Sequence, residues 1–277
     1  MLTRRLNTLL VEKFSGSLHR LVTETSESDL TTPFIDRLGS HSLEVSTRTL
    51  VKRFGASPYA MVRHYLSINE IDGYDDFRPY HMRVAPQGTF HDPAVVDELL
   101  TKKMDQLLQN KFGGDLLSLF TQTTMADLSS PLIETLAGHP IVVSMHLVCE
   151  KFKNSPFAML TSYRDLRRIA GYDNLRPYHL FKAPGGTFQD PAIIDEVVDK
   201  KIRHLCRASF GGDMERLYRE ASARELFSHF PDPLGPGTIS VSMSKAAQYF
   251  GNSPQAMLAR HKQPKNEPLM EPHQLHA

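Results

Sequence analysis

RFGASPYAM (53–61), KFKNSPFAM (151–159) and YFGNSPQAM (249–257) are three copies of one motif, and their spacing decides the fold. The serines of the three copies stand at positions 57, 155 and 253, so that successive copies lie 98 residues apart. The same offset superposes three phenylalanines without a gap: Phe14, Phe112 and Phe210. A fixed period of this kind indicates a tandem repeat, in which each unit buries its apolar face against its neighbours.

A second segment of the chain is duplicated at the same offset. GYDDFRPYHMRVAPQGTFHDPAVVDE (73–98) and GYDNLRPYHLFKAPGGTFQDPAIIDE (171–196) share 17 of 26 residues. The sequence therefore predicts three helical units joined by two Pro-rich connectors of extended backbone, in which Tyr80 and Tyr178 are the expected anchors. The predicted boundaries are units 1–65, 99–163 and 197–262, connectors 66–98 and 164–196, and a flexible tail 263–277.

Helix signals dominate each unit. Asp-Pro pairs at 92–93 and 190–191 are typical of an N-cap followed by the first helical residue. Apolar residues then recur at spacings of three and four as far as Phe112, which predicts a helix of about five turns that ends at Gly113–Gly114. A second helix after Asp115, a short helical turn around 131–136 and a short extended stretch are expected next. We predict an all-α fold.

The threefold motif has the pattern of a helix–turn–helix. Ser57, Ser155 and Ser253 are expected to cap the second helix of each pair, because a proline follows each serine at the first helical position. The second helices are expected at 57–66, 155–164 and 253–262. Over about 20 residues per copy, this arrangement resembles the DNA-reading helix–turn–helix of transcription regulators. The resemblance implies nucleic-acid binding.

The connector and motif together also resemble a tandem repeat of algal, protist and large-virus proteins. That repeat combines a Gly-Ser-Pro helix start, an aromatic residue, a Pro-Gly pair and an aromatic-Asp helix start. The matching stretches here are GASPYAM, FRPYHM, APQGTF and HDPAVVDELL, with phenylalanine where the pattern usually has tryptophan. This resemblance implies a repeat architecture and no particular activity.

Basic side chains recur at two places in each unit, and such positions can follow a phosphate backbone. At the helix starts they are Arg4, Arg5, Lys102, Lys103, Lys200 and Lys201. At the ends of the second helices they are Arg63, His64, Arg164, Arg167, Arg168, Arg260, His261 and Lys262. We take these residues as the candidate nucleic-acid-binding site, with DNA and RNA both open as the ligand.

The charge balance keeps a second interpretation open. Lys and Arg number 32 against 31 acidic residues, so the net charge of +1 gives no general attraction to nucleic acid. In that case the repeated basic residues simply lie on solvent-exposed faces of helices. Cations near helix C-termini are also favoured by the helix dipole. In this interpretation the protein is a structural or scaffolding subunit of a larger protein or ribonucleoprotein assembly, and the aromatic, Pro-rich connectors are its docking elements.

Nothing in the sequence predicts catalysis, a cofactor or a metal site. Cys149 and Cys206 align with apolar residues of the other copies and are expected to be buried, inert thiols. His81 and His179, one in each Arg-Pro-Tyr-His, are expected to pack on aromatic edges, because no carboxylate or cysteine is seen at a metal-ligand spacing. The Gly-Gly pairs lack the Lys-Ser/Thr of a phosphate loop.

The sequence contains no apolar run long enough for a membrane helix and no secretory leader, so a soluble, intracellular protein is expected, with the compartment left open. The first 14 residues resemble a basic, amphipathic transit peptide. They also superpose on residues 99–112, which favours a structural helix. The first copy lacks the Asp-Pro helix start of the other two, which leaves a processed or truncated N-terminus possible as an interpretation.

Overall fold

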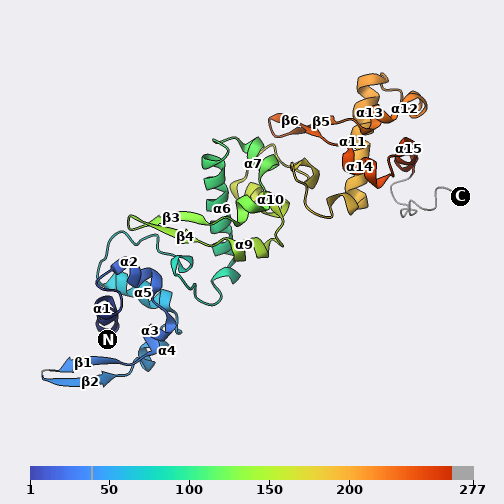
Figure 1. The fold of residues 1–277 in the computed structure, drawn as a ribbon. Helices are drawn as coiled ribbons and strands as arrows, with labels where there is room; N and C mark the ends of the chain where they lie inside the picture. The colour runs from blue at the N-terminus through green and yellow to red at the C-terminus, as the bar shows by residue number, and fades with distance from the viewer. Residues whose placement is uncertain (39, 264–277) are drawn as a thin grey trace. The chain divides into compact units, whose positions relative to one another are not determined.

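The computed structural model describes residues 1–38 and 40–263, and the 98-residue period runs through its secondary structure (Figure 1). The first copy comprises α1 (Leu2–Glu12), α2 (Leu18–Glu24), α3 (Glu27–Thr31), β1 (Phe34–Leu38), β2 (His41–Val45), α4 (Arg48–Arg53) and α5 (Pro58–Ile68). The second comprises α6 (Pro93–Asn110), α7 (Leu116–Gln122), α8 (Met125–Ser129), β3 (Leu132–Leu136), β4 (His139–Val143), α9 (His146–Lys151) and α10 (Pro156–Arg167). The third comprises α11 (Pro191–Ser209), α12 (Met214–Glu220), α13 (Ala223–Phe227), β5 (Phe230–Leu234), β6 (Gly237–Val241), α14 (Ser244–Tyr249) and α15 (Pro254–Lys262).

The all-α prediction is wrong, because each copy contains an antiparallel β-hairpin: β1–β2, β3–β4 and β5–β6 (Figure 1). The short helical turn expected around 131–136 is strand β3, and the short helix α8 ends before it. Leu132, Glu134 and Leu136 alternate inward along this strand. Ala137 and Gly138 have φ of 50° and 78°, the left-handed pair that closes a two-residue hairpin turn.

The predicted helix caps are confirmed. The Oγ atoms of Ser57, Ser155 and Ser253 each accept a hydrogen bond from the backbone N–H three residues later, at 3.2 Å in all three copies. Asp92 and Asp190 cap α6 and α11 in the same manner, from the backbone N–H groups of Ala94 and Ala192. Capping holds the start of each second helix in a fixed relation to the turn before it.

The chain forms two compact units, which divide it after Lys103 within α6. Among the described residues, one unit contains residues 1–103 and 129–151, and the other contains residues 104–128 and 152–263. The core of the first unit gathers Leu6, Phe14, Leu21, Leu30 and Met61. The core of the second lies along α11, where Val197, Ile202, Leu217, Leu226 and Met257 are fully buried. Each unit thus combines parts of more than one repeat.

Each connector bends through two short 3-10 turns, where the sequence predicted extended backbone. They are η1 (Pro79–His81) and η2 (Thr89–His91) in the first connector, and η3 (Pro177–His179) and η4 (Thr187–Gln189) in the second. The turn η1 packs against β4, and η3 packs against β6. A connector therefore joins the hairpin of the copy that follows it. The tail at 264–277 lies outside the described residues.

Candidate functional site

A network of hydrogen-bonded polar side chains in the first unit surrounds His81 in the turn η1. The Nδ1 atom of His81 accepts a hydrogen bond from the backbone N–H of Arg78 at 3.1 Å. Its Nε2 atom lies 3.0 Å from a carboxylate oxygen of Glu134 on β3. Because Nδ1 accepts from the backbone, Nε2 is the ring atom whose N–H group donates to Glu134. The contact fastens the connector to the hairpin.

Lys102 completes this cluster from α6. Its ammonium group donates to the second carboxylate oxygen of Glu134 at 2.6 Å and to the hydroxyl of Tyr80 at 2.9 Å. The Tyr80 hydroxyl donates in turn to Glu98 at 2.7 Å. Burial raises the pKa of Glu134, but the hydrogen bonds from His81 and Lys102 outweigh it and leave that pKa below its usual value. Burial raises the pKa of Tyr80, so its phenol stays protonated.

The second unit repeats the cluster with aspartate in place of glutamate. His179 Nε2 lies 2.9 Å from Asp232, and Lys200 donates to the same carboxylate at 2.7 Å. Tyr178 donates to Glu196 at 2.8 Å. Burial opposes ionisation of Asp232, but His179 and Lys200 together leave its pKa lowered. We name the pair of clusters, His81–Glu134–Lys102 and His179–Asp232–Lys200, the connector clasps.

The expected aromatic packing of the two histidines is confirmed. Each ring meets the preceding tyrosine edge to face, at 4.6 Å for His81 and 4.5 Å for His179. Each histidine also contacts a carboxylate that the sequence analysis did not assign to it, because Glu134 and Asp232 each lie 53 residues downstream of their histidine. The sequence did contain evidence for this contact. Glu134 and Asp232 stand 98 residues apart, so both copies have an acid at the equivalent position.

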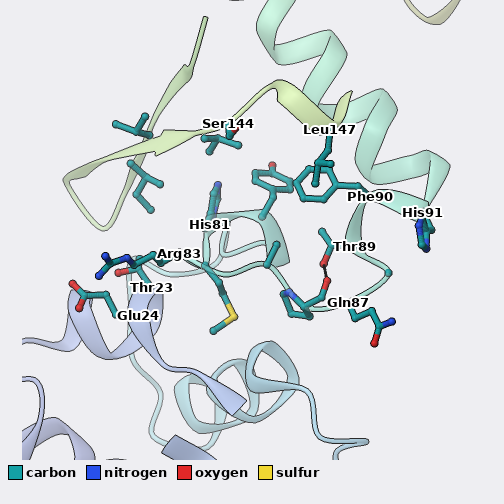
Figure 2. A pocket seen from close by; sticks show the side chains of 18 of the residues that line it. Thr23, Glu24, His81, Arg83, Gln87, Thr89, Phe90, His91, Ser144 and Leu147 are labelled. Atoms are coloured by element: carbon teal, nitrogen blue, oxygen red, sulfur yellow. Dashed lines mark hydrogen bonds between the residues drawn. The ribbon is translucent and has the colours of Figure 1, made fainter. Parts of the chain in front are cut away.

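A groove of about 1000 Å³ opens beside the first clasp (Figure 2). The connector contributes His81, Arg83 and the segment from Gln87 to His91, with the labelled side chains of Thr89 and Phe90 on one side. The strand β4, the loop after it and helix α9 contribute Val142, Ser144 and Leu147, respectively. Helix α2 contributes Thr23 and Glu24, and the Thr23 carbonyl accepts from the Arg83 backbone N–H at 2.7 Å. The walls combine apolar and charged groups.

Two side chains of the groove wall expose apolar surface to solvent. Val142 is 66% exposed and Leu147 is 43% exposed. His19 lies nearby with its ring 4.6 Å from that of His139, and its Nδ1 atom is buried without a hydrogen-bond partner. Burial, together with the neighbouring His139, lowers the pKa of His19. The groove thus combines exposed hydrophobic groups with an unsatisfied polar atom, features common in binding surfaces.

The basic residues at the helix starts lie against the protein itself. Arg4 pairs with Asp36 at 2.6 Å, and Lys102 and Lys200 belong to the clasps. The side chains of Arg5, Lys103 and Lys201 are buried. They donate to the Asp29 carbonyl, to Ser130 Oγ and to Ser228 Oγ, respectively. These six side chains support the hairpins and short helices of their copies.

Most basic residues at the ends of the second helices also have partners. Arg63 donates to the hydroxyl of Tyr59, and the ring of His64 lies 5.3 Å from that of Phe54. In the second copy, Arg164 pairs with Asp165 and Arg167 with Asp105, while Arg168 ends α10 in a left-handed, exposed conformation.

In the third copy, Arg260 makes two hydrogen bonds to Asp195, at 2.8 Å and 2.5 Å. His261 lies 2.7 Å from the hydroxyl of Tyr218, and Lys262 stacks over the same ring at 4.2 Å from its centroid. Within each copy, therefore, the structure does not gather the predicted bases on one open face. Sequence reasoning assigned them by their charge and overlooked the acids that their helices bring near.

A basic pocket that the sequence analysis overlooked lies on α11 in the third copy. Arg203, His204 and Arg207 line a hollow of about 440 Å³ against Pro231 and Pro233 of β5. Arg203 pairs with Asp199 at 3.1 Å. The second copy has Asp105, Gln106 and Gln109 at these positions, and the first has Asn7, Thr8 and Val11. The pocket therefore departs from the repeat symmetry, which is the signal that would have found it.

Both cysteines are buried and unpaired, as predicted. Burial raises the pKa of Cys149. Within residues 1–38 and 40–263, no three His, Cys, Asp or Glu side chains are grouped as a metal site requires. Over the same part of the chain, no helix is both long enough and apolar enough to cross a membrane.

Comparison with family models, curated proteins and solved structures gives no match to this chain.

Proposed function

We propose that this protein is a non-enzymatic scaffold that binds protein partners in the groove beside the first connector clasp. The observation that carries the proposal is the groove itself, where exposed Val142 and Leu147 stand among charged side chains from three elements. A rigid wall with exposed apolar groups and a polar rim is the usual anatomy of a protein interface. The clasp keeps that wall in place.

Placement of the repeated bases supports this choice. Affinity for nucleic acid depends on cations that are free to replace counterions on phosphates. Lys103 and Lys201 are buried, and Lys102, Lys200 and Arg260 are held by carboxylates. The near-zero net charge is in keeping with a protein partner. The buried, unpaired cysteines favour a reducing compartment, so we place this scaffold inside the cell.

Affinity purification with the full chain as bait tests the proposal. We expect a partner that stays bound through nuclease digestion and high salt, and that is lost with the groove variant Val142→Glu/Leu147→Glu. Leu166→Glu is the matched control, since Leu166 is also exposed but does not line the groove. Substitutions at exposed sites change stability little, so loss of folding is not expected. Equal retention by the groove variant would contradict the proposal.

Nucleic-acid binding is the second candidate, and the basic pocket on α11 is the observation that favours it. Arg207 is exposed there beside Arg203 and His204. Anisotropy titrations with duplex DNA, single-stranded DNA and structured RNA, at low and physiological salt, test this candidate. Arg207→Glu should weaken binding and flatten its salt dependence, whereas Arg219→Glu, an exposed change on α12, should not. Binding that is absent or unaffected by Arg207→Glu would reject this site.

A further inference from the structure

Strand β4 contributes its edge to the groove beside the first clasp. Every residue from Pro140 to Ser144 lines the groove, whereas none of the described residues Leu132–Leu136 of β3 does. Successive side chains of a strand point to opposite faces of a sheet, so one face of β4 would contribute only alternate residues. An unbroken run of residues indicates that the outer edge of β4 forms this wall.

The register of the hairpin shows which backbone groups lie along that edge. The turn at 137–138 has two residues, so the flanking residues Leu136 and His139 are a hydrogen-bonded pair. Hydrogen-bonded and non-hydrogen-bonded pairs alternate along an antiparallel ladder. Counted from the turn, the fourth pair is Ile133 and Val142, which is non-hydrogen-bonded. The N–H and C=O groups of Val142 therefore point away from β3 and toward the groove.

The two backbone groups of Val142 are available for pairing. Within residues 1–38 and 40–263, neither its N–H nor its C=O group has a hydrogen-bond partner. Val142 is also 66% exposed. A strand edge with unpaired N–H and C=O groups is a template on which another extended chain can form hydrogen bonds. The groove therefore offers backbone recognition as well as apolar contact.

The remaining wall of the groove indicates which side chains such a chain can carry. Leu147 on α9 supplies exposed apolar surface (Figure 2). Arg83 of the connector and Lys151 at the end of α9 add exposed cations. The acids of the same wall have partners of their own, which are the pairs Glu24–Arg20 and Glu150–His146. The groove therefore favours an extended segment that combines apolar residues with an acidic one.

We propose that the groove binds an extended segment of a partner protein as a third strand of the β3–β4 sheet, through backbone hydrogen bonds to Val142. The proposal rests on the scaffold function and names the chemistry of its partner: an apolar side chain against Leu147 and an acid near Arg83 or Lys151. In strand addition the backbone bonds supply affinity and the alternate side chains supply specificity. A helical partner is disfavoured, because it would cover the Val142 backbone groups without pairing them.

Val142→Pro tests the backbone contact, because it removes the N–H group and keeps an apolar side chain. That N–H group points away from β3, and proline is tolerated at such edge positions, so the hairpin should still form. Ser240→Pro is the matched control. Ser240 lies 98 residues later, at the same edge position of β6, and does not line the groove. Circular dichroism should show the wild-type spectrum for both variants.

Random peptides displayed on phage and selected against the full chain provide the probe. We expect enriched sequences to combine apolar residues with an acid. Their synthetic peptides should bind Val142→Pro about tenfold or more weakly than the wild type, and Ser240→Pro as tightly as the wild type. Equal affinity for all three proteins, or selection that enriches no peptide sensitive to Val142→Pro, would overturn the proposal.

Methylation of the peptide backbone gives a second readout, which distinguishes a strand from other bound conformations. The N–H groups of an added strand point alternately toward β4 and away from it, so N-methylation should weaken binding at every second residue. The amide of Val142 should also exchange more slowly when the peptide is bound. A loss with the helical period of about 3.6 residues, or no loss at any position, would overturn the proposal.

The two proposals fail in different ways. If a partner is lost with Val142→Glu/Leu147→Glu but binds Val142→Pro as tightly as Ser240→Pro, the groove function holds and strand addition is wrong. If peptides pair with β4 but purification yields no groove-dependent partner, the scaffold function is wrong.

Discussion

The clasp of the second unit lends itself to a double-mutant cycle on His179 and Asp232. The His179 side chain is completely buried and that of Asp232 is 7% exposed, with 2.9 Å between Nε2 and the carboxylate. A hydrogen bond to a charged group contributes about 1.5–3 kcal/mol, and removing one member of a buried pair costs about 3–5 kcal/mol. We therefore expect Asp232→Ala to lower the free energy of unfolding by about 3 kcal/mol, since Lys200 also loses its acceptor.

The coupling energy is the decisive quantity in this cycle. Urea unfolding of the full chain, followed by circular dichroism, gives it from the wild type, Asp232→Ala, His179→Ala and the double variant. We expect about 1.5–3 kcal/mol for the pair. The exposed ion pair Arg216–Glu220 is the control and should show no measurable coupling. A coupling below about 0.5 kcal/mol for His179 and Asp232 would refute the clasp as an energetic contact.

The same pair has a defined dependence on pH. The pKa of Asp232 is lower in the folded chain than its usual value of about 4. The folded state therefore gains stability above that usual pKa and loses it as pH falls through the lowered value. The difference in unfolding free energy between the wild type and Asp232→Asn should shrink on acidification below about pH 4. A difference that stays constant to low pH would contradict this assignment.

Three further substitutions test other parts of the structure. Ser155→Ala removes the cap of α10 and should cost about 0.5–2 kcal/mol in urea unfolding, with no loss contradicting the cap. Gly235→Ala would drive a methyl group into the ring of Tyr172, so it should lower the Tm far more than Gly211→Ala, which has a similar φ and open space; equal effects would refute this contact. Burial lowers the pKa of Lys201, so wild-type stability should rise with pH as that lysine loses its proton, and Lys201→Met should abolish the rise. An identical pH profile for the two proteins would contradict the lowered pKa of Lys201 in the folded chain.

The sequence predicted the parts of the fold that depend on local chemistry. Ser-Pro and Asp-Pro helix starts were located correctly, because a cap and the fixed φ of proline act within three residues. The long helix α6 followed from its apolar periodicity. The same motifs recur 98 residues apart, so each prediction was supported by more than one copy of the repeat.

The second strand of each hairpin lies where a short extended stretch was expected, but the first strand and its pairing were missed, because their signals are short and ambiguous. LIETL in β3 consists largely of residues with high helix propensity, and five residues are too few to separate a period of 2 from one of 3.6. Its strand conformation is set by pairing with β4 and by the left-handed turn at Ala137 and Gly138. The conformation of residues 132–136 is therefore set by tertiary contacts, and it does not follow from the intrinsic helix or strand propensity of these residues.

The candidate site was predicted only in part, for a related reason. The sequence singled out His81 and His179, but the carboxylates that accept from them come from hairpins that were not expected. The charged residues at helix starts were read as free cations, although Lys102 and Lys200 lie within hydrogen-bond distance of the same carboxylates. A contact between residues far apart in the sequence can be recognised in a repeat protein only when both residues of the pair are compared between copies.

Quantitative affinity purification of the full chain, the Val142→Glu/Leu147→Glu variant and the Leu166→Glu control tests the central claim most directly. The scaffold function predicts a protein partner that survives nuclease and high salt, is retained by the control and is depleted from the groove variant. A partner retained equally by all three proteins, or one released by nuclease, would contradict the claim. Release by nuclease would direct attention to the basic pocket at Arg203 and Arg207.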